Sequence, residues 1–118
     1  MKFMLMIYGT DQAWDEAGRE ECYVESAGVA RDLHEKGKFL ATAPLHSAVT
    51  AKSVRVRAGK AQVTDGPFAE TREQLGGFFL IDAADEAEAL EIAARIPGAR
   101  VGTVEVRQVL EIDGIPER

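Results

Sequence analysis

Two segments with helical periodicity divide the chain, and each lies between two short apolar runs. In the first, from about Ala17 to Lys36, apolar residues recur at spacings of three and four on one side of the helix. The second begins at Asp85, with Glu88 three residues later as in a capping box, and it ends at Pro97-Gly98. The apolar runs predict strands at about Lys2 to Tyr8, Phe39 to Ala43, Phe78 to Asp82 and Thr103 to Ile112.

Two further features refine this strand pattern. Valine and arginine alternate in SVRVR, as in a strand with one wet face, and we expect a hairpin of Ser53–Arg57 and Ala61–Thr64. Its predicted loop has three residues, Ala58-Gly59-Lys60. In the last predicted strand the valines change parity, which indicates a bulge near Gln108 or burial of both faces.

The element order is thus β-α-β, an inserted hairpin, and a second β-α-β. Two such halves form a ferredoxin-like α+β sandwich, in which one antiparallel sheet carries both helices on one face. The strands at Lys2–Tyr8 and Phe78–Asp82 are apolar at both parities, so the second face of the sheet is also apolar. An uncovered apolar face marks an interaction surface. We therefore expect a homodimer in which two sheets stack face to face.

Length and charge limit the function classes. The 118 residues suit one domain, which we place at residues 1–112, followed by a tail at 113–118. With 14 basic and 20 acidic residues the net charge is −6, which disfavours binding to nucleic acid or to an anionic membrane. The longest apolar stretch, FMLMIY, is too short to span a membrane, and the N-terminus lacks a signal-peptide pattern. We therefore expect a cytoplasmic protein.

The sequence predicts no metal and no cofactor. Two histidines and one cysteine at positions 22, 34 and 46 match no metal-ligand spacing. The chain contains neither a P-loop nor a G-x-G-x-x-G motif. Cys22 is the only cysteine, and its acidic neighbours are expected to raise the pKa of the thiol, which argues against a nucleophile.

Three stretches, MKFMLMIYG, SVRVRAGKAQVTDGPFAETREQLGGFFLID and VEVRQVLEI, resemble the DGPF group of YCII-related proteins. The segment DGPFAETREQLGG is the most specific part of this resemblance. It implies a ferredoxin-like α+β domain in bacteria that forms a dimer of the α/β-barrel kind, with a largely unassigned biochemical function. Some relatives are encoded beside, or fused to, extracytoplasmic-function sigma factors, which implies a sigma factor as a possible partner.

One departure from the wider family bears on catalysis. The smaller YCII proteins resemble this chain through LHEKGKFLATAPL, and two turns earlier they carry a helix-borne His that is thought to pair with an Asp as an acid–base dyad. Counting back from His34 places Ser26 at that position here. The absence of this histidine argues against catalysis by the same dyad.

The candidate catalytic residues are Asp65 and His46. Asp65 can hold the turn at Gly66-Pro67 by hydrogen-bonding the backbone two residues on, which is a structural role. Alternatively, its carboxylate lies at the rim of a cleft and acts as an acid or base. His46 lies in the loop PLHSAVT and is either simply exposed or, if the hairpin folds back, the partner of Asp65 in a replacement dyad.

The remaining candidates would bind a substrate. Phe68 either anchors the loop or forms a cleft wall, while Glu70 and Arg72 belong to a solvated charge run or bind a polar or charged substrate. Gly76-Gly77 at a strand start predicts a bulge or a close backbone approach. The other expected lining residues are Tyr8, Gly66, Pro67.

Two function classes follow from these patterns. In the first, the dimer binds a small polar organic molecule or acts on it as an acid–base enzyme. In the second, it is a noncatalytic partner module linked to a sigma factor, and the DGPF loop is structural. A deep cleft lined by Asp65, His46 and Tyr8 would favour the first class, and a filled, dry loop core the second.

Overall fold

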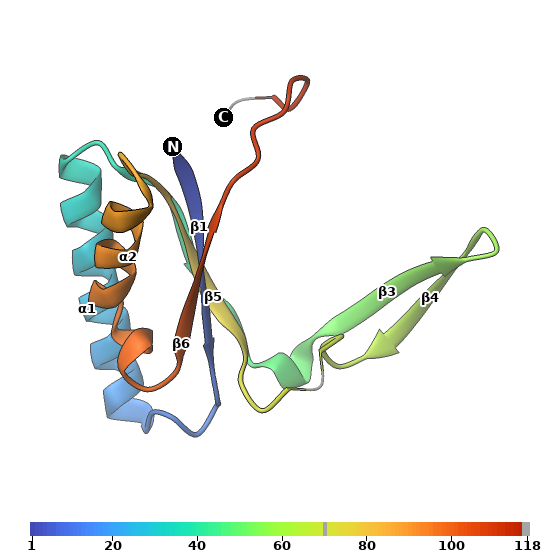
Figure 1. Ribbon diagram of the computed structural model, residues 1–118. Helices are drawn as coiled ribbons and strands as arrows, with labels where there is room; N and C mark the ends of the chain where they lie inside the picture. The colour runs from blue at the N-terminus through green and yellow to red at the C-terminus, as the bar shows by residue number, and fades with distance from the viewer. Residues whose placement is uncertain (70, 117–118) are drawn as a thin grey trace.

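The computed structural model describes residues 1–69 and 71–116 (Figure 1). Within these residues the main sheet has four antiparallel strands in the order β2-β5-β1-β6. The strands are β1 (Lys2–Gly9), β2 (Phe39–Pro44), β5 (Gln74–Asp82), β6 (Thr103–Gln108). Helices α1 (Glu16–Glu35) and α2 (Glu86–Arg95) lie on one face of this sheet (Figure 1). The predicted α+β class is confirmed, and the strand order is compatible with a ferredoxin-like sandwich.

The core lies between the sheet and these helices. Phe3 and Leu5 of β1 are buried there, because alternate side chains of a strand point to the same face. The other buried apolar residues are Phe79, Ile81, Ala83, Val29, Leu33, Ala89, Ile92, Ala93, Ile96. In the part of the chain that the structure describes, no helix is both long enough and apolar enough to cross a lipid bilayer.

The second face of the sheet is apolar at its centre, as predicted. Met4 and Met6 alternate with the buried residues of β1, and Phe78 and Leu80 do the same in β5. Met4 lies opposite Leu80, and Met6 lies opposite Phe78. These four side chains form the open face, which carries no helix (Figure 1).

The helix ends follow the predicted caps with one difference. Gly37, with φ of 72°, follows the end of α1 as expected. At the start of α2 the Asp85 carboxylate accepts from the Glu88 N–H (2.9 Å). The Glu88 carboxylate accepts from the Ala84 N–H (3.0 Å), so the second half of the capping box reaches one residue further back. Lys38 donates to the same oxygen (2.8 Å), and mainly this hydrogen bond lowers the pKa of Glu88.

Three predicted details of the strands are wrong. Strand β5 begins at Gln74 rather than at about Phe78, because its first residues pair with Tyr8 and Gly9 of β1. Strands β3 (Lys52–Arg57) and β4 (Lys60–Asp65) pair up to their last residues, so the loop between them is only Ala58-Gly59. Both residues have positive φ, 52° and 75°, as a type I′ turn requires, and an alanine does not signal this conformation. The last strand ends at Gln108 with no register shift, because Gln108 already lies opposite the first residues of β1.

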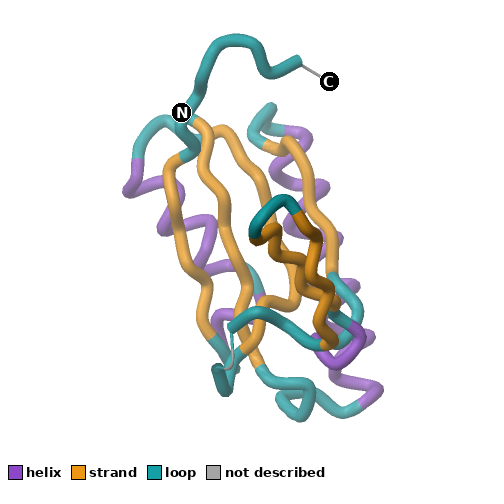
Figure 2. Tube along the Cα trace, turned by 90° about the vertical axis from the view of Figure 1, so that its right-hand side faces the viewer, coloured by secondary structure: helices purple, strands orange, loops and turns teal. Residues whose placement is uncertain are grey.

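The β3–β4 hairpin projects from the body of the molecule (Figure 1) and stands on the side of the open face (Figure 2). Its base is held by two hydrogen bonds that involve the backbone of Gly66. The Gly66 N–H donates to the Ala51 carbonyl (2.7 Å), and the Ser53 hydroxyl donates to the Gly66 carbonyl (2.8 Å). Apart from Ser53, the residues of both strands are exposed.

The glycine pair of β5 has the two predicted features. The pairing of β1 with β5 shifts between Ile7 and Tyr8, which leaves Gly76 as the extra residue of a bulge. A Cβ added at Gly77 would lie 3.0 Å from the Ala43 carbonyl oxygen, whereas at Gly76 the nearest atom would be 3.8 Å away. Gly77 therefore allows the close approach of β2, and Gly76 forms the bulge.

We predict that Gly77→Val lowers the free energy of unfolding by roughly 1–3 kcal/mol, because its side chain would collide with the backbone of β2. Urea denaturation followed by circular dichroism measures the change. The matched control is Gly76→Val, whose added atoms meet an ordinary contact distance. Equal effects of the two substitutions would show that the close approach at Gly77 is unimportant for stability.

Candidate functional site

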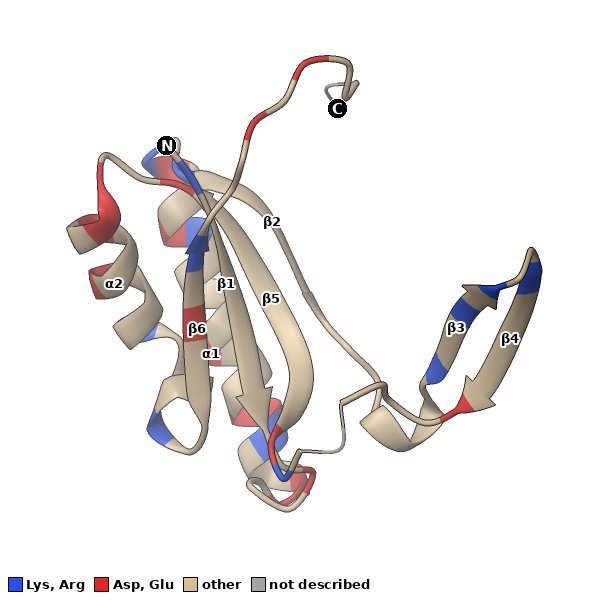
Figure 3. Ribbon diagram, turned by 45° about the vertical axis from the view of Figure 1, so that its right-hand side comes forward, with Lys and Arg blue, Asp and Glu red and all other residues tan. Residues whose placement is uncertain are grey.

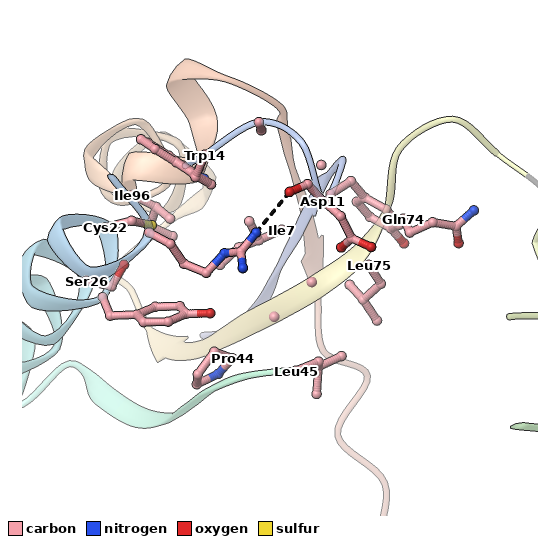
Figure 4. A pocket seen from close by; sticks show the side chains of 18 of the residues that line it. Ile7, Asp11, Trp14, Cys22, Ser26, Pro44, Leu45, Gln74, Leu75 and Ile96 are labelled. Atoms are coloured by element: carbon pink, nitrogen blue, oxygen red, sulfur yellow. Dashed lines mark hydrogen bonds between the residues drawn. The ribbon is translucent and has the colours of Figure 1, made fainter. Parts of the chain in front are cut away.

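A cleft of about 600 Å³ lies at the end of the sheet where β1 and β2 finish and β5 begins. These three strand ends meet because β5 pairs with both β1 and β2 in antiparallel register. In Figure 4, Trp14 and Cys22 lie on the side of α1, Pro44 ends β2 and is followed by Leu45, and Gln74 belongs to β5. The cleft is therefore built from segments that are distant in sequence.

Polar contacts join the two loops at the mouth of the cleft. The Ser47 hydroxyl donates to the Asp11 carboxylate (2.6 Å), which ties the loop before the 3₁₀ helix η1 (Ala48–Thr50) to the loop after β1. Arg19 on the first turn of α1 donates to the Asp11 carbonyl (2.9 Å). Asp11 thus holds both Arg19, which lines the cleft wall, and the facing loop that contains Ser47.

Arg19 is the main positive group of the cleft. Among residues 1–69 and 71–116, no carboxylate forms a salt bridge with it, so its charge is not neutralised by a partner there. A guanidinium carries five N–H donors, and only one of its nitrogens is used by the Asp11 carbonyl. The group can therefore bind an anionic or strongly accepting ligand.

The back of the cleft is apolar and is stiffened by an ion pair. Ile96 and the 3₁₀ helix η2 (Pro97–Arg100) supply part of this wall. Arg100 at the end of η2 makes two hydrogen bonds to the Glu25 carboxylate of α1, at 2.8 and 2.9 Å. These hydrogen bonds lower the pKa of Glu25. The pair holds η2 against α1 and so keeps the wall in place.

Cys22 lines the cleft on the α1 side. Its thiol has a raised pKa, as predicted, but the main cause is burial, and the acidic neighbour Glu25 contributes less. A hydrogen bond with Ser26 acts in the opposite direction. Ser26, which stands where the smaller relatives are expected to carry a helix-borne histidine, also lines the cleft. Because the thiolate is the nucleophilic form, the raised pKa argues against covalent catalysis by Cys22.

The structure divides the predicted site residues into two groups. Tyr8 and His46 line the cleft. Asp65, Gly66, Pro67, Phe68 and Arg72 do not line it, and Glu70 lies outside the described residues.

The DGPF turn lies at the base of the hairpin. The Asp65 carboxylate forms an ion pair with Lys52, which lies opposite it in the strand pair. Within the described residues no hydrogen bond joins Asp65 to His46, so their proposed dyad is not formed within one chain. Phe68 is exposed, and the Arg55 guanidinium carbon lies 5.0 Å from the centre of its ring. Neither a filled loop core nor a cleft wall describes this turn.

Sequence reasoning did not identify Asp11, Trp14, Arg19 and Ser47 as site residues. Their one local signal is the single tryptophan in the polar stretch between β1 and α1. Together with His46 they give the cleft one aromatic wall residue, its arginine cation and groups that exchange hydrogen bonds. Among the described side chains, no group of three or more His, Cys, Asp or Glu is arranged to hold a metal ion.

The comparisons with known proteins identify the family of this chain. The family described as YCII-related domain matches residues 1–113. An uncharacterized protein from Rhizobium meliloti (strain 1021) is 38% identical over 112 residues, covering 91% of this chain and 90% of that protein. The resemblance seen in the sequence is thereby confirmed, and the chain belongs to the YCII-related family.

Proposed function

We propose that this protein binds a small organic molecule in the cleft between α1 and the ends of β1 and β2. The observation that supports this is a cleft of about 600 Å³ with apolar walls and a few converging polar groups. Clefts that hold small molecules are typically about 300–1,000 Å³ and have this kind of lining. The proposal corresponds to the first function class expected from the sequence.

The guanidinium of Arg19 indicates the chemistry of the ligand, since the Asp11 carboxylate that also lines the cleft already accepts a hydrogen bond from Ser47. Arg19 lacks a carboxylate partner among the described residues, and its planar guanidinium suits a carboxylate or a similar anion. Trp14 and Tyr23 line the same cleft and can pack against an apolar or aromatic body. The ligand that fits best has an apolar part and one anionic group.

Binding has stronger support than catalysis. An imidazole at His46 is a suitable proton-transfer group, and Tyr8 lies in the same cleft. The predicted acid–base enzyme, however, relies on Asp65, with His46 as a second candidate, and the Asp65 carboxylate pairs with Lys52 outside the cleft. A catalytic role would therefore depend on His46 and Tyr8 rather than on the predicted dyad.

The functional unit that we propose is a homodimer that joins the open faces of two sheets. The apolar side chains Met4, Met6, Phe78 and Leu80 lie at the centre of this face. A stable dimer of this kind buries on the order of 2,000 Å² in total. The partner-module alternative, linked to a sigma factor, has one feature in its favour, the exposed valines of the β3–β4 hairpin.

Arg19→Gln tests the ligand class. We expect it to weaken the binding of small aromatic carboxylates such as benzoate and 4-phenylbutyrate at least about tenfold, because a hydrogen bond to a charged group contributes about 1.5–3 kcal/mol. The corresponding amides should bind both proteins equally weakly. Ligand-observed NMR titration measures the dissociation constants.

The control is Arg31→Gln, on the same helix but outside this cleft. It should leave binding unchanged. Carboxylate binding that is unaffected by Arg19→Gln would contradict the proposed ligand class.

A second test uses Cys22 as a reporter of the cleft. Because burial raises the pKa of its thiol, the folded protein should react slowly with iodoacetamide at pH 7 and faster as the pH rises above 9. Benzoate in the cleft should slow the reaction further. Mass spectrometry follows the alkylation, and the protein in urea supplies the rate for an open thiol. A folded-state rate at pH 7 equal to the rate in urea would rule out a protected Cys22.

If the protein is the proposed homodimer, light scattering at micromolar concentration should give a mass of twice 12.8 kDa. Met6→Asp should shift this mass toward that of the monomer, because it places a charge at the centre of the open face. A wild-type protein that remains a monomer at these concentrations would refute the dimer.

A further inference from the structure

The β3–β4 hairpin, residues 52–65, has an apolar side that is left open to solvent. Cross-strand pairing places Val54 opposite Val63 and Val56 opposite Ala61, so these four side chains share one side. The three valines are 61–64% exposed. An isolated two-stranded hairpin is marginally stable in water, so an exposed apolar side of this length needs a partner.

The charges of this arm and of the body are opposite. Residues 52–65 contain four basic residues and one acidic residue, a net charge of +3. The rest of the chain contains ten basic and nineteen acidic residues, a net charge of −9. In Figure 3 most of the coloured positions of the hairpin ribbon are blue, for Lys and Arg, whereas red positions, for Asp and Glu, are frequent in the body. The body of this protein is therefore an electrostatically complementary partner for its own arm.

The arm is also placed on the correct side for such a contact. It stands off the open face, with its base next to the sheet end where β5 begins (Figures 1 and 2). A second copy whose sheet covers the open face would therefore lie beside the arm. Six-residue strands span about 20 Å, which is long enough to follow one side of a small domain.

We propose that the arm of each subunit clasps the body of a second copy, which contacts both the valine side of the arm and the opposite side, where Arg55, Arg57 and Lys60 lie. The contact is reciprocal, because a two-fold dimer repeats every contact. The arm thus extends the sheet-face interface, and this inference rests on the homodimer proposed above. It assigns a role to the inserted hairpin that neither the ligand cleft nor the core requires.

The test is the double variant Val54→Thr/Val63→Thr in the full chain. Threonine keeps the shape and strand preference of valine but has a hydroxyl in place of one methyl group, which is poorly accommodated in an apolar interface. Sedimentation velocity across a dilution series should show dimer affinity at least tenfold weaker than that of the wild type. The circular dichroism spectrum should be unchanged, because both side chains are exposed within the subunit.

The matched control is Val24→Thr on α1, which is 70% exposed and lies outside the arm. It should leave dimer affinity unchanged. A double arm variant with wild-type dimer affinity would overturn the clasp while leaving the sheet-face dimer standing. Loss of the dimer in Met6→Asp, together with wild-type dimer affinity in the arm variant, would show that the sheet face alone holds the dimer.

Hydrogen exchange of the wild-type protein gives an independent measurement. The amides of β3 and β4 should exchange at least tenfold more slowly in the dimer than after dilution to the monomer. Raising the salt concentration should weaken the dimer, because it screens the attraction between the arm and the acidic body. Fast exchange of the arm in a protein that is dimeric by mass would also overturn the proposal, since it would show a free arm.

Discussion

The pairing of β1 with both β5 and β6 is the contact on which the rest of this structure depends. It joins the first strand of the chain to strands from its second half, and it places Phe3 and Leu5 at the centre of the core. Because β5 also pairs with β2, one strand connects both β-α-β halves. The helices are then confined to one face, and the open face is a direct result of this arrangement.

The same pairing creates the cleft. The ends of β1 and β2 and the beginning of β5 lie at one end of the sheet, and the chain leaves each of them in a loop. The hydrogen bond between Ser47 and Asp11 closes the gap between two of these loops, while Gly77 lets β2 and β5 come close. Arg19 then projects from the helix that follows β1. The position of a cation among apolar walls is thus a product of strand order.

The hairpin is held together by different interactions from those of the body. Its two strands form backbone hydrogen bonds with each other, but almost all of their side chains remain exposed within the subunit. The DGPF turn belongs to this region: Asp65 pairs with Lys52 across the strands, and Gly66, with φ of 95°, turns the chain back toward the sheet. The DGPF motif therefore shapes the base of an arm. In the described part of the chain it does not line the cleft.

Several features were determined by local sequence. Periodicity and capping residues located the helices to within one or two residues, since Asp85 and Gly37 act on their immediate neighbours. The apolar parity of β1 and β5 predicted the open face, and the glycine pair predicted the bulge, because each signal depends on adjacent residues alone. The turn at Ala58 escaped prediction, since the pairing of Arg57 with Lys60 imposes a conformation that alanine rarely adopts.

Apart from Tyr8 and His46, tertiary structure decided which side chains form the site. Asp11, Arg19 and Ser47 form no motif, because the antiparallel strand order rather than sequence spacing brings the two loops together. The predicted partnership of His46 with Asp65 assumed that the hairpin folds back over the loop, and the Asp65–Lys52 pair within the hairpin competes with that contact. The end of β6 was likewise set by where β1 begins, since a strand continues only while a partner lies beside it. Sequence therefore determined the elements and their faces, and three-dimensional pairing determined which side chains meet.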